Sequence, residues 1–196
     1  MQERSEATRA KLLSAAVKRF SRYGYDATGV AEICEAAGVS KGAFYHHFPH
    51  KRAIFLELLE RWLASLDKQL EAIRLEEPGV PAALEHMAHT APEIFKTARG
   101  QLPLFLEFWA QASRDPAVKK ATIAPYRRYR QFFAALIRAG QAEGSLRPVD
   151  ADMAGQTLVS LALGLLLQGL LDPHGTDWEQ AAQGEVLLFL EALRQR

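Results

Sequence analysis

Apolar residues return every three or four positions along almost the whole chain, and this helical spacing limits the fold more than any other feature. Between residues 30 and 37, for example, Val30, Ile33, Cys34 and Ala37 follow one another at i, i+3, i+4 and i+7, which places them on one helix face. No alternation of apolar and polar residues, the pattern typical of a strand, lasts for more than a few residues. The sequence therefore predicts an all-α fold.

Glycine, proline and small polar residues divide the chain into a series of expected helices. The first ends at Gly24, the second begins at Thr28, and the third runs from Ser40 to the break at Pro49. A long helix is expected to open near Lys51, and further helices are expected at 82–97, 102–113, 116–141, 151–171 and 177–194. We predict an N-terminal domain, residues 1–50, and a larger C-terminal helical domain, residues 51–196.

Two short helices joined by "AGVS" (37–40) match the helix-turn-helix pattern, in which the second helix enters the DNA major groove. Gly38 permits a tight turn, and the Ser40 hydroxyl can cap the helix that follows. Residues 1–52 carry nine Lys/Arg and five Asp/Glu, a net charge of +4, whereas the remaining residues carry fifteen and eighteen, a net charge of −3. A basic N-terminal part on a mildly acidic body favours a polyanionic partner.

The third expected helix has one side suited to DNA. At about 100° per residue its polar and small residues share one broad face, while Phe44 points toward the first two helices. Lys41 can reach a phosphate or a guanine edge, and Gly42 lets the backbone approach DNA closely. Helix starts add backbone amides that favour phosphates. The candidate DNA contacts are Thr28, Ser40, Lys41, Gly42, Ala43, Tyr45, His46 and Lys51.

Residues 16–55 resemble the N-terminal DNA-binding segment of the TetR (tetracycline-repressor) family. The matching features are Phe20, "YGY" at 23–25, Thr28, Ile33, "AGVSKGAFYHHF" at 37–48 and Lys51. Gly29 stands where the family commonly has a small hydroxyl residue, and Cys34 where it commonly has alanine. The resemblance implies a homodimeric repressor, bound to an inverted repeat of double-stranded DNA and released when a small molecule binds the larger domain.

Other kinds of site find less support in the sequence. His46 and His50 stand at i, i+4, a spacing that can ligate zinc, but Pro49 breaks the helix between them and no carboxylate or thiol completes a set. Cys34 lies on an apolar face and is better interpreted as a core residue than as a nucleophile. Nucleophile elbows, phosphate loops and paired carboxylates are not found, so we expect no enzyme, no metal and no cofactor.

Aromatic residues concentrate in the middle of the chain, where most of them will form ordinary core. The family resemblance implies that some line an apolar cavity, for which phenol and indole rings are well suited. The candidate lining is Trp62, Met87, Phe105, Trp109, Tyr126, Tyr129 and Gln168. Few charges fall on these helix faces, so the expected effector is a small apolar or aromatic molecule, with acyl compounds among the candidates. Glu107 is expected to be semi-buried, and a surface position between the aromatic turns is the alternative.

The last two expected helices carry more apolar surface than one chain of 196 residues can cover, which favours a two-fold contact between copies. The apolar run at 158–171 is shorter than the roughly 20 residues that cross a bilayer, so we expect no membrane partner. A charged start and a single cysteine favour the cytoplasm. A ligand-binding or interaction module without operator-specific DNA binding remains the alternative function.

Overall fold

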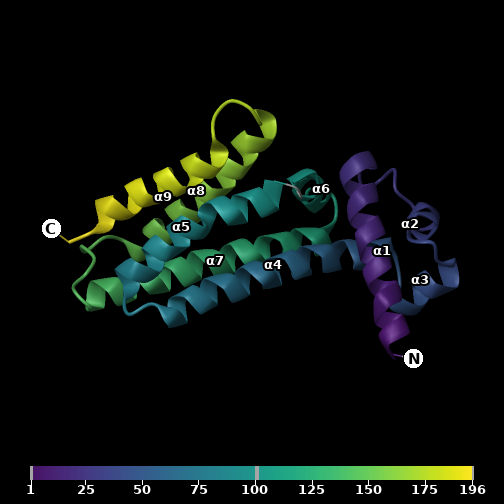
Figure 1. The fold of residues 1–196 in the computed structure, drawn as a ribbon, viewed down its shortest axis with the longest axis horizontal. Coiled ribbons are helices and arrows are strands. Elements are labelled where there is room, and N and C mark those ends of the chain that lie inside the picture. Colours follow the sequence, from purple (N-terminus) through teal and green to yellow (C-terminus); the bar gives the residue numbers. More distant parts are fainter. Residues whose placement is uncertain (1, 100–101, 196) are drawn as a thin grey trace. The chain divides into compact units, whose positions relative to one another are not determined.

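The computed structural model describes residues 2–99 and 102–195, and its elements are helices (Figure 1). In chain order they are α1 (Gln2–Tyr23), α2 (Val30–Ala37), α3 (Lys41–His47), α4 (Lys51–Glu76), α5 (Val80–Arg99), α6 (Leu102–Ala112), α7 (Pro116–Ala142), α8 (Ala151–Leu171) and α9 (Trp178–Leu193). Within the described ranges there is no strand, and an isolated antiparallel bridge joins Leu146 to Arg194. The predicted all-α fold is confirmed.

The helices form two compact units. The N-terminal unit comprises residues 1–64 and 101–122, and the C-terminal unit comprises residues 65–100 and 123–196, so that α4 and α7 run through both. In the N-terminal unit α1 packs against α2, α3 and α6, and α2 packs against α3. The largest of its fully buried apolar side chains include Leu12, Phe20, Ile33, Phe44, Ile54 and Phe55. The predicted domains, residues 1–50 and 51–196, are defined by function and not by packing. Their boundary stays a prediction.

Glycine, serine and proline end and begin the short helices where the sequence predicts. Gly24 and Gly38 have φ angles of +82° and +65°, a left-handed conformation that ends a helix at little cost for a residue without a Cβ. The Ser40 hydroxyl oxygen accepts a backbone N–H of the first turn of α3 at 3.2 Å. Phe48 is extended ahead of Pro49 and ends α3. These local signals position the helix-turn-helix.

Thr28 does not cap α2, and that prediction is wrong. Gly29 holds the N-cap position and has no side chain to offer. The Thr28 side chain is fully buried, and its hydroxyl donates to the Gly24 carbonyl oxygen at 2.8 Å. The hydroxyl is directed inward, where the carbonyl oxygens of Gly24 and, at 3.3 Å, Arg19 lie within reach as acceptors.

The C-terminal unit is built from long helices that pack closely. In this unit α5 packs against α8 and α9, and α8 packs against α9. At Gly155 of α8, an added Cβ would lie 2.6 Å from the Arg130 carbonyl oxygen and 2.8 Å from the Ala134 nitrogen of α7, so only glycine permits this approach. The side chains of Asp150 and Asp177 cap α8 and α9.

The long helices differ from the predicted ranges mainly at their ends. The predicted range of α8, 151–171, is confirmed, whereas α5 extends over 80–99 instead of 82–97. The helices α5 and α7 continue through Pro92 and Pro125, respectively. Packing of the apolar faces in these long helices outweighs the loss of one backbone hydrogen bond at each proline.

Candidate nucleic-acid interface

Helix α3 turns an apolar side to the core and a polar side to solvent. Phe44 is fully buried, and its ring lies 5.4 Å from the ring of Tyr45 and 5.7 Å from the ring of Phe48, measured between centroids. The Tyr45 side chain is itself 55% exposed. The exposed residues on the polar side are Lys41, Gly42, Tyr45 and His46. A cation, a bare backbone position, a phenol and an imidazole thus share one surface, as the sequence predicts.

Ser40 and Ala43 begin the same helix. Ser40 is exposed and Ala43 is half-buried, and the Ser40 oxygen accepts the Ala43 N–H. The Ser40 oxygen is therefore engaged in the cap, while its hydroxyl proton remains able to donate, because a hydroxyl can accept and donate at once. The start of α3 thus combines a cap with a hydrogen-bond donor.

Lys51, the first residue of α4, is half-buried and not extended into solvent. Its ammonium nitrogen donates to the Tyr25 carbonyl oxygen at 2.8 Å and lies 4.2 Å from the centroid of the Tyr25 ring. Burial lowers the pKa of Lys51, while the nearby carboxylates of Asp26 and Glu32 oppose that shift. The predicted phosphate anchor is thus also a link between α4 and the turn that precedes α2.

His50 caps α4, a role that was not predicted from the sequence. Its ring nitrogen Nδ1 accepts the backbone N–H of Ala53 at 3.0 Å. A neutral imidazole ring that accepts at Nδ1 carries its proton at Nε2. The His50 side chain is exposed. The signal was present, because a polar residue between Pro49 and the first residue of a helix occupies the N-cap position.

The start of α2 is the least well capped point of the interface. Gly29 offers no side-chain hydrogen bond, and a Cβ added to Gly29 would lie 2.5 Å from the Glu32 carboxylate. The carboxylate of Glu32 therefore lies over the backbone at the start of its own helix. A negative charge is favourable for the helix there but unfavourable for an approaching phosphate.

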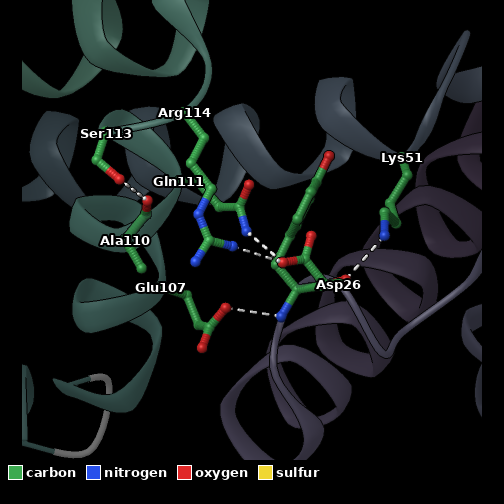
Figure 2. A network of polar contacts seen from close by, with 8 residues as sticks. Asp26, Lys51, Glu107, Ala110, Gln111, Ser113 and Arg114 are labelled. Carbon is green, nitrogen blue, oxygen red and sulfur yellow. Dashed lines mark hydrogen bonds and ion pairs between the residues drawn. The ribbon is translucent and has the colours of Figure 1, made fainter.

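The turn between α1 and α2 is held by α6, a contact that the sequence does not predict. Glu107 of α6 is half-buried and accepts the backbone N–H of Tyr25 at 2.8 Å. Gln111 is buried and donates to Asp26 Oδ2 at 3.1 Å, and Arg114 reaches the same oxygen at 3.3 Å. Figure 2 shows the three side chains converging on the turn. The expected semi-burial of Glu107 is confirmed.

Aromatic packing accompanies these polar contacts. The Tyr25 ring lies 5.5 Å from Phe20 of α1 and 4.4 Å from Phe55 of α4, measured between centroids. Phe55 in turn lies 4.1 Å from Phe108 of α6. A further ion pair joins Arg52 to Asp115 at 2.8 Å. The turn before α2 is therefore tied to α4 and α6 by both apolar and charged contacts.

The candidate ligand-lining residues fall in both units. In the N-terminal unit Trp62 and Phe105 meet edge to face with ring centroids 4.3 Å apart, and Trp109 is half-buried. In the C-terminal unit Met87 and Tyr129 are buried and Tyr126 is half-buried. Burial, together with a hydrogen bond to Asp67, raises the pKa of Tyr129, so its phenol stays protonated and can donate.

Gln168 does not share the inward orientation expected of a lining residue. It is exposed on α8, and its amide donates to the Gly164 carbonyl oxygen of the same helix at 3.3 Å. The prediction failed because α8 is apolar on almost every side, so the sequence pattern does not reveal which side faces inward.

Exposed apolar side chains gather on α8 and α9. They are Met153, Leu167, Leu171 and Leu188, and Leu171 and Leu188 are 74% and 73% exposed. Among the described residues, α8 is the one helix long and apolar enough to cross a membrane. Length and composition alone do not make it a membrane span, because a core helix of a soluble protein has the same features. The opposite side of α8 is buried at Ala154, Leu158 and Leu165. Large exposed aliphatic side chains in one region are typical of a surface that binds a partner.

The lone cysteine lies in the core of the helix-turn-helix. Cys34 is buried on α2, and burial raises the pKa of its thiol, which lowers the fraction of reactive thiolate. The predicted core position is confirmed. In the part of the chain that the structure describes, no three or more His, Cys, Asp or Glu side chains come together in a way that could hold a metal ion.

Comparison with known proteins gives the family. The sequence model of "Bacterial regulatory proteins, tetR family" matches residues 12–58, and that of "BetI-type transcriptional repressor, C-terminal" matches residues 82–188. The chain belongs to the TetR family. It is therefore a DNA-binding transcriptional regulator and not an enzyme, as the sequence predicts.

Individual relatives agree with this assignment. The TetR-family chain is 29% identical to the HTH-type transcriptional regulator UidR of Escherichia coli over 171 residues, which are 85% of this chain and 83% of UidR. A transcriptional regulator from Saccharomonospora viridis, solved in complex with choline, is 26% identical with a TM-score of 0.82, covering 98% of this chain and 100% of that one. A TetR transcription regulator from Haloarcula marismortui has the same fold, with 18% identity, a TM-score of 0.84 and coverage of 97% and 100%.

Proposed function

We propose that this TetR-family chain binds operator DNA through the polar side of α3 and the starts of the neighbouring helices. The observation that carries the proposal is the exposure of this side opposite the fully buried Phe44. Lys41 would contact a phosphate or a guanine edge, and the phenol of Tyr45 would donate to a phosphate. The proposed contacts are Ser40, Lys41, Gly42, Ala43, Tyr45, His46 and Lys51, which is the predicted set without the buried Thr28 side chain.

The regulator acts as a homodimer on an inverted repeat. Two copies joined by the exposed apolar sides of α8 and α9 would bury Leu171 and Leu188 and present two recognition helices related by a two-fold axis. Such a pair reads half-sites separated by about 34–36 Å, one turn of DNA, or a multiple of it. Covering the apolar side of α8 with a second copy also removes the need for a membrane, in keeping with a cytoplasmic protein.

The control exerted is repression, relieved when a small effector binds. An effector changes operator affinity only through its different affinities for the DNA-bound and the free arrangement. The edge-to-face pair of Trp62 and Phe105 and the half-buried Trp109 support an apolar or aromatic effector, acyl compounds included. In the C-terminal unit, Met87, Tyr126 and Tyr129 are further proposed lining residues, and the exposed Gln168 is left out.

A small organic cation is a second candidate effector. The relative from Saccharomonospora viridis was solved with choline, and aromatic faces such as those of Trp62 and Trp109 attract quaternary ammonium groups. Titration of the protein with choline, with a medium-chain fatty acid and with an aromatic compound, while Trp fluorescence and release of bound DNA are recorded, separates the two classes. Release by choline alone would exclude the apolar effector.

The DNA-binding proposal is tested by selecting bound fragments from genomic DNA with the purified protein. Enrichment of a sequence with two-fold symmetry, followed by tight binding of that sequence at moderate salt, is the expected result. The alternative, a ligand-binding module without operator-specific binding, predicts no enrichment over bulk DNA. Reporter expression in the presence and absence of the regulator then determines the sign of control.

A further inference from the structure

Tyr25 is held at both of its backbone polar groups by different helices. Its N–H donates to Glu107 of α6 at 2.8 Å, and its carbonyl oxygen accepts from the Lys51 ammonium of α4 at 2.8 Å. The Tyr25 ring also lies under the Lys51 nitrogen, at 4.2 Å from the centroid. Tyr25, in the turn before α2, therefore connects a carboxylate on α6 with a proposed phosphate contact on α4.

The turn is shaped to receive the Glu107 carboxylate. Gly24 adopts a φ of +82°, and a Cβ at this position would lie 3.4 Å from Glu107 Oε1, so the carboxylate rests against bare backbone. The adjacent residue Phe108 anchors α6 on Phe55, and Gln111, one turn later, holds Asp26. A half-buried carboxylate that accepts a backbone N–H forms a stronger bond than the same pair in water.

We propose that Glu107 is a positioning residue for operator binding: by holding Tyr25 it places the Lys51 ammonium where a DNA phosphate can reach it. An ammonium carries three N–H donors, so Lys51 can bond the Tyr25 carbonyl and a phosphate together. Glu107 itself does not contact DNA, since a half-buried carboxylate would repel phosphates. The inference rests on the proposed function, because it takes Lys51 as a DNA contact.

The test measures operator affinity and its salt dependence for Glu107→Ala, Lys51→Ala and the double variant, all in the full-length chain. Each single change is expected to weaken binding about tenfold and to lower the salt slope by about one. If Glu107 acts through Lys51, then Glu107→Ala has little further effect on a protein that already carries Lys51→Ala. Glu93→Ala, an exposed glutamate on α5, serves as the matched control and should bind like the original protein.

The outcomes separate the two proposals. Additive losses in the double variant, or unchanged affinity and salt slope in Glu107→Ala, would overturn the role of Glu107 while leaving operator binding intact. Failure of the unaltered protein to prefer any DNA would instead remove the proposed function. Glu107→Gln keeps a neutral acceptor oxygen and is expected to lose only about twofold in affinity. If Glu107→Ala does not fold, as judged by helical content, the same cycle is run with Glu107→Gln, and additive losses in that cycle would equally overturn the role of Glu107.

Discussion

Helices α3 and α8 both expose one side to solvent, but with opposite chemistry. The exposed side of α3 carries Lys41, Tyr45 and His46, and its inner side is closed by Phe44. The exposed side of α8 carries large aliphatic residues, Leu167 and Leu171 among them. A polar exposed surface is well hydrated in the absence of DNA. An aliphatic surface is favourable only when another protein surface buries it. The two surfaces of this TetR-family regulator are therefore suited to different kinds of partner.

The largest effect on operator affinity is expected from placing a charge on the exposed apolar surface of α8 and α9. Leu188→Glu places a charge where a second copy should bury a side chain that is 73% exposed in one chain, so the dimer should dissociate. Operator affinity should then fall about 100-fold or more, because two half-sites are no longer bound together. Sedimentation and gel shift measure both effects.

Leu75→Glu is the matched control for this change. Leu75 is 68% exposed at the end of α4, away from α8 and α9 in sequence, and its replacement should leave a dimer with unchanged operator affinity. A Leu188→Glu protein that remains dimeric would mean that another surface joins the copies.

The second effect comes from the inner side of α3. Phe44→Ala leaves a cavity beneath the recognition helix and should destabilise the N-terminal unit by about 3–5 kcal/mol, because the ring is fully buried. DNA binding should be lost while the dimer persists, since α8 and α9 are unchanged. Chemical denaturation followed by helical content, together with sedimentation, checks this separation. Dissociation of the Phe44→Ala dimer would show that the two surfaces are not independent.

A smaller effect is expected on the outer side of α3. Lys41→Ala should weaken operator binding by about tenfold and leave both stability and dimerisation unchanged, because Lys41 is exposed and its proposed role is to contact the DNA alone. Lys68→Ala, an exposed lysine further along α4, is the control and should bind normally. Equal gel-shift affinities for the two variants would remove Lys41 from the contacts.

The smallest expected effect is an increase in stability. Gly29→Ser supplies the side-chain cap that α2 lacks and should raise thermal stability slightly, by about a few tenths of a kcal/mol. The Glu32 carboxylate, 2.5 Å from the added Cβ, must rotate away, which is easy for the end of a flexible side chain. Operator affinity should rise as the carboxylate leaves the helix start. A lower melting temperature would mean that the Glu32 position stabilises the helix more than a serine cap does.

Local signals predicted most helix boundaries. Ser40 caps α3, Gly38 ends α2 and Pro49 ends α3, because each of these residues acts on backbone groups within a few positions of itself. The same locality explains the confirmed burial of Phe44, which follows from the helical period alone. At Thr28 the local signal gave a wrong prediction of an N-cap, because the hydroxyl donates to the Gly24 carbonyl oxygen and does not bond the helix that follows.

The sequence by itself determined the class of fold, the order of the helices and the polar side of α3, since periodicity and capping depend on near neighbours. Only the tertiary structure decided that Glu107 reaches Tyr25, a residue 82 positions away, and that Lys51 is shared with the same turn. It also decided that Gln168 faces outward. The physical reason is that a helix apolar on every side, or a carboxylate between aromatic residues, acquires its orientation from the elements packed against it.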